Sequence, residues 1–492
     1  MVMYGDIEQK VIKLLHRQNP WWETAGVPEN LTKPFKRRDF YVIRDKRLGE
    51  GEITAIIGPR QVGKTTMMYQ LIEHLIYRKK VDPKRILYVS FDYPYLTTIM
   101  DTQLNDILEI YSTRVLKEPV SKLGDRIYVF LDEVCRLENW SRVLKGWYDL
   151  KYPIKFIISD SSSANILHGS SESLAGRITI QIMFPLKFLD FLRYHMPEKD
   201  SIFKMVNRTL RDAFVESIKE SNPGLFYNAL KESYSGLAPY EDEIKILLQT
   251  YLLKDGYPGL LEIESLDECA ERLRTYLNLT IYKDIIRIFN LRDPRALEEL
   301  VILIADQSSQ RVDYSSLSGT LGLKKDTLIK YLNYLESVFL SSRAEFYSKS
   351  RASRIRKAKK LYLSNVGLRN AIVGELHETL LEDAAELGKI VETLVHDHCR
   401  RLKFNLEPGS RLELFYWRTA QGKEVDIVFE VSRRPVAIEC KYRNEIRKSE
   451  LKGIRQFRKE HDKCPGIVIT KDVLDYRDEV VFTPLWLFLM MC

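Results

Sequence analysis

The sequence predicts a multidomain α/β protein, and three observations lead to this prediction. With 492 residues, the chain is longer than one hydrophobic core usually supports, which suggests about three domains. A buried-strand pattern, a glycine-rich loop and a helical pattern follow one another over residues 53–77. A helical pattern and two strand patterns around a turn lie over residues 387–442. We therefore expect an α/β domain near the beginning and a separate α/β domain near the end.

The composition is ordinary for a water-soluble protein, with 45% hydrophobic and 29% charged residues. The longest apolar run, LWLFLMMC at residues 485–492, is shorter than the ~18 residues that span a bilayer, and we interpret it as a buried last strand. The six cysteines show no C-x-x-C spacing, and the first residues contain no signal-peptide core. We expect a cytoplasmic protein without membrane contact, disulfides or structural zinc.

The net charge of +8 is unevenly distributed along the chain. Residues 310–492 contain 33 Lys and Arg against 25 Asp and Glu, whereas residues 1–309 contain 43 of each. The basic surplus therefore lies entirely in the later part, which indicates contact with a polyanion such as DNA. A solvated basic face is the alternative.

Residues 58–66 read GPRQVGKTT and match the phosphate-binding pattern G-x-x-x-x-G-K-[ST]. Because a strand pattern precedes this loop and a helical pattern follows it, backbone N–H groups and a positive helix end converge on one point. We expect Lys64 to reach the outer phosphates of ATP and Thr65 to hold Mg²⁺ through its hydroxyl. The predicted nucleotide-binding residues are Gly58, Pro59, Arg60, Gln61, Val62, Gly63, Lys64, Thr65 and Thr66.

A second strand pattern, RIYVFLDEV, supplies the other half of such a site, because it ends in Asp132 and Glu133. We expect Asp132 to hold Mg²⁺ through water and Glu133 to act as the general base for the attacking water. An acidic strand end without a catalytic role is the alternative.

A third strand pattern, at residues 154–159, is followed by polar residues. Ser159 or Ser161 is predicted to sense the γ-phosphate, with a helix N-cap as the alternative. Arg177 is predicted to be an arginine finger or a phosphate sensor, with a structural ion pair as the alternative. A finger that acts in trans would require an oligomer, and we expect a homo-oligomer.

Residues 201–305 show mostly amphipathic helix patterns and are predicted to form a helical lid over the nucleotide, or else a helical spacer. From Ser315 the pattern indicates a short helix, a turn at Gly322, a second helix over residues 324–336 and a strand, which is typical of a winged helix.

The winged-helix pattern is followed by a strongly basic run, KSRASRIRKAKK, with seven basic residues among the twelve at 349–360. We interpret this run as the wing or its extension and expect it to contact phosphates. A solvated loop, or a winged helix that packs only on protein, is the alternative. The predicted nucleic-acid contacts are Lys324, Lys325, Lys330, Arg351, Arg354, Arg356 and Lys357.

Two strand patterns in residues 415–442 flank a turn near Ser432 and Arg433. A hairpin with this turn places Asp426 opposite Glu439, and Lys441 shares a strand face with Glu439. Two carboxylates bind Mg²⁺ or Mn²⁺ through oxygen, and the lysine could orient or activate a water that attacks a phosphodiester.

A helical pattern at residues 387–402 precedes this hairpin. Glu392 lies among its apolar positions and is predicted as a third carboxylate of the site, and Gln456 on a later helix as a supporting residue. His396 and His398 are two residues apart on the helix, so they point to different faces, and we expect them at the surface.

Several of these motifs together resemble a prokaryotic and archaeal family of AAA-type P-loop ATPases. These motifs are GPRQVGKTT, LDEV with the following Asn139 and Trp140, SLAGR, and P-L-x-F-x-x-F. The resemblance implies a parallel sheet in which the catalytic strand lies next to the phosphate-loop strand. The chain departs from the family at Asp160, where many relatives have glycine. This difference puts in doubt the prediction that Ser159 or Ser161 senses the γ-phosphate.

The C-terminal domain of that family has long been described only as a domain of unknown function. Two patterns in this chain resemble it, W-R-x-x-x-G-x-E-V-D from Trp417 to Asp426 and I-E-C-K ending at Lys441. The same patterns resemble the PD-(D/E)XK nucleases, which share the restriction-endonuclease-like fold. Both resemblances together cover roughly residues 35–460.

The sequence therefore predicts an ATPase that uses ATP and Mg²⁺, binds DNA and cleaves it through Asp426, Glu439, Lys441 and Glu392. The resemblance implies branched or broken DNA as the substrate. A regulatory switch with a silent nuclease fold is the alternative, and no motif indicates a helicase or translocase. The predicted domains are a lead-in segment (1–50), a P-loop ATPase core (51–200), a helical lid (201–305), a winged helix (306–365) and a PD-(D/E)XK nuclease-like domain (366–492).

Overall fold

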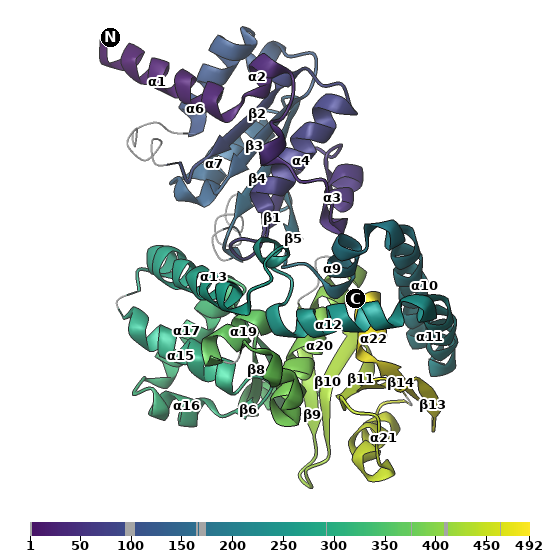
Figure 1. Ribbon diagram of the computed structural model, residues 1–492. Coiled ribbons are helices and arrows are strands. Elements are labelled where there is room, and N and C mark those ends of the chain that lie inside the picture. Colours follow the sequence, from purple (N-terminus) through teal and green to yellow (C-terminus); the bar gives the residue numbers. More distant parts are fainter. Residues whose placement is uncertain are drawn as a thin grey trace. The chain divides into compact units, whose positions relative to one another are not determined.

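The protein forms two compact units, Met1–Phe184 and Pro185–Cys492 (Figure 1). The boundary between them falls inside the predicted ATPase core, and the finer division into five domains stays a prediction. The computed structural model describes residues 2–93, 104–163, 166, 174–291, 293–374, 376–407, 412–462 and 464–492.

The first unit contains a five-stranded sheet in which all strands pair in parallel, in the order β2-β3-β4-β1-β5. The predicted parallel sheet is therefore confirmed. The strands are mostly continuous apolar runs, as expected where both faces of a parallel sheet are covered. Their bounds are β1 Ile53–Ile57, β2 Ile86–Ser90, β3 Ile127–Asp132, β4 Ile154–Asp160 and β5 Ile178–Ile182.

The expected neighbour of the phosphate-loop strand was wrong. Strand β4 lies between β1 and β3, so the strand that ends in Asp132 does not pair with the phosphate-loop strand. The order of parallel strands depends on where each crossover connection places the next strand, and the spacing of motifs along the chain does not determine this. The carboxyl ends of β1, β3 and β4 still lie at one edge of the sheet.

The N-terminal segment is part of the first unit because it covers the free edge of β2. The side-chain amide of Asn19 donates to the carbonyl of Tyr88 at 2.8 Å and accepts from its N–H at 2.6 Å. The indole N–H groups of Trp21 and Trp22 both donate to the carbonyl of Ile86. An uncovered strand edge would invite pairing with another chain. The helices are α1 Val2–Gln18, α2 Trp21–Thr24, α3 Arg38–Val42, α4 Lys64–Tyr77, α6 Leu104–Ile110 and α7 Trp140–Asp149.

The second unit begins with a series of helices, which agrees with the helical patterns predicted for residues 201–305. Their role as a lid stays a prediction. They are α9 Phe188–His195, α10 Asp200–Glu220, α11 Pro223–Leu237, α12 Glu241–Lys254, α13 Leu266–Asn278, α14 Ile286–Phe289 and α15 Pro294–Asp306.

The next segment alternates short strands and helices. Gly322 lies between α16 and α17 with a left-handed φ of 62°, which suits the predicted turn. Part of the basic run forms a short helix, α18. The bounds are β6 Arg311–Val312, α16 Tyr314–Thr320, α17 Lys325–Ser337, β7 Ser341–Phe346, α18 Arg351–Arg356, β8 Lys359–Leu363 and α19 Val366–Val373.

One mixed sheet runs through the rest of this unit, in the order β13-β14-β12-β11-β10-β9-β7-β8-β6. Strand β7 pairs with β9 in parallel, so the predicted winged-helix and nuclease-like segments share a single sheet. The remaining elements are α20 Ala384–Leu406, β9 Leu414–Arg418, β10 Glu424–Val431, β11 Arg434–Cys440, α21 Lys452–Glu460, β12 Gly466–Thr470, β13 Asp475–Arg477, β14 Val480–Pro484 and α22 Leu485–Met491.

The apolar run at residues 485–492 forms helix α22, so the predicted last strand was wrong. Every residue of α22 is buried, and a short run that is apolar on all sides cannot be assigned to strand or helix from its periodicity. Among the residues that the structure describes, no helix has the length and apolar character needed to cross a membrane.

Candidate functional site

The phosphate loop joins β1 to α4 in a backbone conformation that requires glycine. A Cβ atom on Gly58 would lie 2.0 Å from the carbonyl oxygen of Met183, which leaves no room for a side chain. Gly63 precedes α4 with a left-handed φ of 89°, a conformation that costs a larger residue energy. These two positions explain why the motif has glycine at its first and sixth residues.

Lys64 is buried at the start of α4 and turns back over the loop. Its ammonium donates to the carbonyl oxygens of Gly58 at 2.9 Å and Pro59 at 3.0 Å. The loop is also supported by Arg37, which donates to the carbonyl oxygen of Val62 at 3.2 Å. Sequence reasoning missed Arg37 because it lies in the N-terminal segment, outside any motif.

Asp132 lies at the carboxyl end of β3 and collects three hydroxyl groups. Its Oδ2 accepts from Thr65 Oγ1 at 2.7 Å and from the Tyr88 hydroxyl at 2.9 Å, and its Oδ1 accepts from Ser159 Oγ. The structure thus brings together the two residues predicted to hold Mg²⁺. Their oxygens are the hard ligands that Mg²⁺ prefers, so this donor set fits the ion.

Glu133 follows directly, with a left-handed φ of 55°. Its backbone N–H donates to Ser159 Oγ at 3.1 Å. In the described part of the chain, its Oε2 atom is buried without a hydrogen-bond partner. Burial raises the pKa of Glu133 to about 7, against the opposing effect of Lys64. A carboxylate with a pKa near neutrality can accept a proton from water at physiological pH.

The two sensor candidates differ in their contacts. Ser159 touches both Asp132 and Glu133, whereas Ser161 is buried and its hydroxyl has no hydrogen-bond partner among the described residues. Arg177 forms an ion pair with Asp149 at 2.8 Å. This contact is the one expected if Arg177 has a structural role. Its role as a finger stays a prediction.

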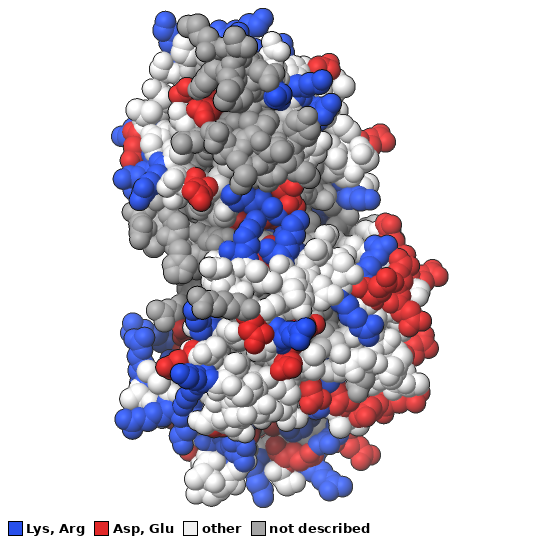
Figure 2. All heavy atoms as spheres, turned by 90° about the vertical axis from the view of Figure 1, so that its left-hand side faces the viewer, with Lys and Arg blue, Asp and Glu red and all other residues white. Residues whose placement is uncertain are grey.

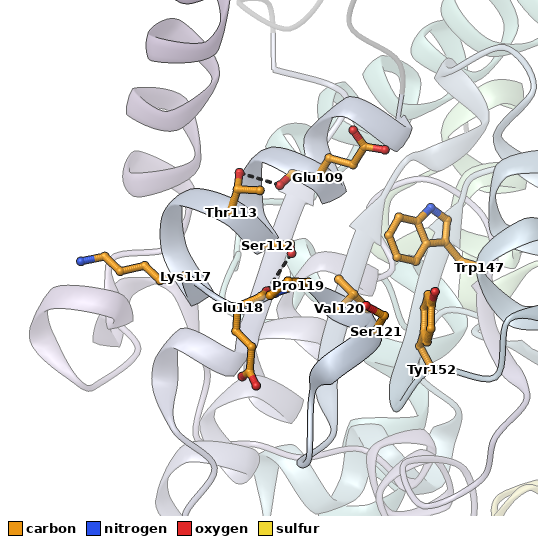
Figure 3. Close-up of a pocket in the computed structure, with 10 residues that line it drawn as sticks. All are labelled: Glu109, Ser112, Thr113, Lys117, Glu118, Pro119, Val120, Ser121, Trp147 and Tyr152. Carbon is orange, nitrogen blue, oxygen red and sulfur yellow. Dashed lines mark hydrogen bonds between the residues drawn. The ribbon is translucent and has the colours of Figure 1, made fainter.

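A cavity of about 450 Å³ also lies in the first unit (Figure 3). Its wall includes the rings of Trp147 and Tyr152, which meet edge to face with centroids 6.0 Å apart. None of the predicted site residues lines this cavity, so it is separate from the phosphate loop.

The hairpin of the second unit has the predicted register. Strands β10 and β11 are antiparallel, with Ile427 opposite Ile438 and Val431 opposite Arg434, so the next pair beyond Ile427 and Ile438 is Asp426 and Glu439. The turn residues Ser432 and Arg433 both have positive φ, 51° and 65°, as two-residue hairpin turns require.

Glu439 and Lys441 form an ion pair at 2.8 Å. Burial, together with the neighbouring Asp426, raises the pKa of Glu439 to about 8 against the opposing effect of Lys441. The carboxylate of Asp426 accepts from the backbone N–H of Cys440 at 2.9 Å. Burial alone would raise the pKa of Asp426, but Lys360 and Lys441 outweigh it and lower that pKa.

Lys360 is the residue of this site that sequence reasoning placed elsewhere, in the basic run. Its side chain is buried, and its Nζ lies 3.0 Å from Glu392 Oε1, 3.0 Å from Glu424 Oε1 and 3.4 Å from Asp426 Oδ1. The hydroxyl of Tyr362 donates to the same Glu392 oxygen at 3.0 Å. Burial raises the pKa of Glu392 to about 7, while Lys360 opposes this.

The predicted metal site does not fit this arrangement. Two of its three carboxylates, Asp426 and Glu392, are bonded to Lys360. Among the residues that the structure describes, no three His, Cys, Asp or Glu side chains gather as metal ligands. Gln456 does not support the carboxylates either, because its amide bonds to Lys423 and Glu460.

The expectation for His396 and His398 was wrong, because both are fully buried. His396 stacks on the Tyr362 ring with centroids 3.8 Å apart, and His398 Nε2 accepts from the backbone N–H of Phe188 at 3.3 Å. Burial lowers the pKa of both rings. From Ile390 to Lys403 most residues of α20 are buried, so the faces that carry His396 and His398 are both covered by protein.

Most of the predicted nucleic-acid contacts are accessible. Arg354 is half-buried, with its guanidinium 4.5 Å from the centroid of the Phe415 ring, so part of its side chain serves packing. Figure 2 shows Lys and Arg side chains along one flank of the visible face of the second unit, and Asp and Glu along the opposite flank. The exposed residues of the set are Lys324, Lys325, Lys330, Arg351, Arg356 and Lys357.

The strand, glycine loop, helix and acidic strand end of the first unit define a P-loop nucleotide-binding domain. Residues 50–192 match the family model described as an AAA domain, so this part of the chain is similar to the AAA-type P-loop domains. Residues 245–379 and 387–488 match two further models, each described as a domain of unknown function (DUF8612 and DUF4143).

Curated relatives cover most of the chain at low identity. The uncharacterized protein MJ1637 of Methanocaldococcus jannaschii is 27% identical over 380 residues, which are 76% of this chain and 74% of the relative. An uncharacterized protein of Haemophilus influenzae is 22% identical over 385 residues, 76% of this chain and 79% of the relative.

Two solved structures from Aeropyrum pernix resemble the chain weakly. The ORC1 protein in complex with DNA has a TM-score of 0.30 and 12% identity, with 72% of this chain and 96% of that chain covered. The ORC2 protein with ADPNP and ADP has a TM-score of 0.35 and 14% identity, with 72% and 98% covered. Similarity at this level carries no argument about function.

Proposed function

We propose that this protein binds ATP with Mg²⁺ at the phosphate loop and hydrolyses it. The observation that carries the proposal is the carboxyl edge of β3. There Asp132 accepts from Thr65, and the adjacent Glu133 has a buried oxygen without a partner in the described structure. The match of residues 50–192 to the AAA domain supports the same interpretation.

Each residue of this edge has a distinct part in the proposed reaction. Bound Mg²⁺ would neutralise charge on the phosphates and polarise the terminal one. Lys64 exchanges its bonds to Gly58 and Pro59 for phosphate oxygens. Glu133 accepts a proton from the attacking water, and Ser159 holds Glu133 in place through the bond to its backbone N–H.

ATP turnover of three variants tests this proposal. Glu133→Gln should lose about 10²-fold or more of the turnover while it still binds ATP, because it lacks only the base. Lys64→Ala should lose ATP binding itself. Glu138→Gln is the matched control, since Glu138 is an exposed neighbour on the same loop. Unchanged turnover in Glu133→Gln would remove the proposed base.

We further propose that the second unit contacts DNA through α17 and α18. The order of α15, β6, α16, α17, β7 and β8 supports a winged helix, and six of the seven predicted contact residues are exposed. A basic helix pair can hold phosphates irrespective of base sequence.

Binding of labelled linear, nicked and four-way-junction DNA at several salt concentrations tests this contact. Replacing Lys324 and Lys325 by Ala should weaken binding and reduce the slope of log K against log salt by about 0.9 for each phosphate that the variant no longer neutralises. Replacing the exposed pair Lys79 and Lys80 is the control and should change neither. Equal effects of the two pairs would contradict a specific contact.

Cleavage of DNA at Asp426, Glu439 and Lys441 is a second candidate function, favoured by the hairpin register that brings these residues together. The same DNA substrates, with Mg²⁺ or Mn²⁺ and with or without ATP, provide the assay, with Asp426→Ala alongside. Cleavage by the wild type that is absent in Asp426→Ala supports the candidate. No cleavage under any condition favours a regulatory switch with a silent nuclease fold.

A further inference from the structure

In the second unit, Glu392, Glu424 and Asp426 form a carboxylate cluster around the ammonium of Lys360. Lys360 is 3% exposed, and its ammonium lies within 3.4 Å of one oxygen from each of three carboxylates. Glu424 and Asp426 come from β10, two residues apart on one face, and Glu392 comes from α20. A lysine ammonium has three N–H donors, so one donor is available for each carboxylate.

Other groups hold the same carboxylates in place around Lys360. Arg418 pairs with the second oxygen of Glu424 at 3.1 Å, and the N–H of Cys440 donates to the second oxygen of Asp426. Tyr362 donates to Glu392. The ring of Tyr416 lies 5.9 Å from the ammonium and provides a further favourable contact. The carboxylates are thus oriented toward Lys360 from several elements.

A divalent cation would use the same carboxylate oxygens. Mg²⁺ and Mn²⁺ need oxygens at about 2.0–2.2 Å from the ion, and a lysine ammonium among those oxygens excludes such an ion by both space and charge. Without either cation, three adjacent and partly buried carboxylates would repel one another strongly.

We propose that Lys360 is a built-in cation that takes the place of a divalent metal ion among Glu392, Glu424 and Asp426. The native cluster is therefore held together without metal at this position. Replacing Lys360 with methionine, which is neutral and one atom shorter, removes the ammonium and its volume and converts the cluster into a divalent-cation site. This inference goes beyond the proposed ATPase and does not depend on it, and it opposes metal-dependent cleavage at Asp426, which Lys360 contacts.

The test measures binding of MnCl₂ to the full-length protein without nucleotide, by the loss of the free Mn²⁺ EPR signal. Lys360→Met should bind about one Mn²⁺ per chain more than the wild type. Lys359→Met is the matched control, because Lys359 is the adjacent buried lysine and its ammonium donates to the backbone carbonyl of Arg354. Lys359→Met should bind as many ions as the wild type. Adding Glu392→Gln to Lys360→Met should abolish the gain.

The thermal midpoint is the second readout. The midpoint of Lys360→Met should fall below that of the wild type without metal and recover with MnCl₂ or CaCl₂, whereas the wild type should not respond. If Lys360→Met is unfolded without metal, the same recovery is followed by circular dichroism during refolding with MnCl₂. An equal number of bound ions in wild type and Lys360→Met, or no recovery with either salt, would overturn the proposal. The absence of ATP turnover would not affect the proposal about Lys360.

Discussion

At the scale of single residues, the carboxylate of Asp132 organises the nucleotide site. Three hydroxyl groups donate to its two oxygens, and they come from the first turn of α4, from β2 and from β4. Thr65 was part of a motif, and Ser159 was one of two sensor candidates. Tyr88 could not be singled out, because its strand looks like any buried apolar run. We infer that Tyr88 is a positioning residue that acts through Asp132.

Tyr88→Phe tests this role, because it removes the hydroxyl and keeps the ring near Tyr69, whose centroid is 4.7 Å away. A single hydrogen bond contributes about 1 kcal/mol, so the Mg²⁺ concentration for half-maximal ATP turnover should rise about 3- to 10-fold. Turnover at saturating Mg²⁺ should change less. Tyr128→Phe, on the neighbouring strand β3, is the control. Identical Mg²⁺ dependence in wild type and Tyr88→Phe would show that the hydroxyl has no positioning role.

The pH dependence of ATP turnover follows from Glu133. Its pKa is raised to about 7, chiefly by burial, and a general base acts only when deprotonated. Because the raised pKa keeps the carboxyl protonated in mild acid, kcat/KM for ATP should be low at about pH 5.5 and rise to a plateau above about pH 8. The residual activity of Glu133→Gln should lack this rise. A flat wild-type profile over that range would contradict the assignment.

At the scale of elements, the hairpin β10–β11 shows how much a local pattern can determine. Its register depends on a two-residue turn, and the alternation of apolar residues sets which side chains share a face. The positions of Asp426, Glu439 and Lys441 relative to one another were therefore predictable. Glu392 of α20 was predicted as a third carboxylate from its place among apolar helix positions, whereas no spacing along the chain indicates that Lys360 of β8 meets these residues.

The turn of this hairpin allows a stability test. Arg433 has a φ of 65°, which costs a non-glycine residue about 1 kcal/mol. Arg433→Gly should therefore raise the free energy of unfolding of the second unit by about 0.5–1 kcal/mol. Arg208→Gly provides the contrast, because Arg208 lies inside helix α10 and glycine there should cost about 1 kcal/mol. Urea denaturation measures both, and destabilisation by Arg433→Gly would show that the turn conformation is not the one described.

At the scale of the whole molecule, the nucleotide site and the carboxylate cluster lie in different units. The loop, Asp132, Glu133 and the residues that hold them all lie within Met1–Phe184. The carboxylate cluster and the predicted nucleic-acid contacts lie within Pro185–Cys492. Each unit has its own sheet and its own buried residues, so each site has a complete local framework.

A fragment of residues 1–184 should therefore fold and bind ATP with a Kd within about 3-fold of that of the whole chain, a difference of less than about 1 kcal/mol. A fluorescent ATP analogue and circular dichroism measure these two properties. A shorter fragment, 37–184, is the control. It lacks the segment that covers β2 and should be less stable, because the edge loses Asn19, Trp21 and Trp22. If fragment 1–184 folds but does not bind ATP, residues of the second unit must contribute to the nucleotide site.

The sequence by itself determined those features whose physical cause is local. A glycine loop between strand and helix, an acidic strand end and a two-residue hairpin turn each depend on neighbours within a few residues, so Gly58, Lys64, Asp132 and Asp426 could be assigned from their patterns. The helical character of residues 201–305 is local in the same sense.

The tertiary structure alone decided which distant elements meet. It placed β4 between β1 and β3, buried His396 and His398 on a helix surrounded by protein, and made α22 a helix. It also placed Lys360, which the sequence shows only as part of a basic run, among three carboxylates. Burial and strand order result from packing over the whole unit, and a single charged residue carries no local sign of whether it will face water or an opposite charge.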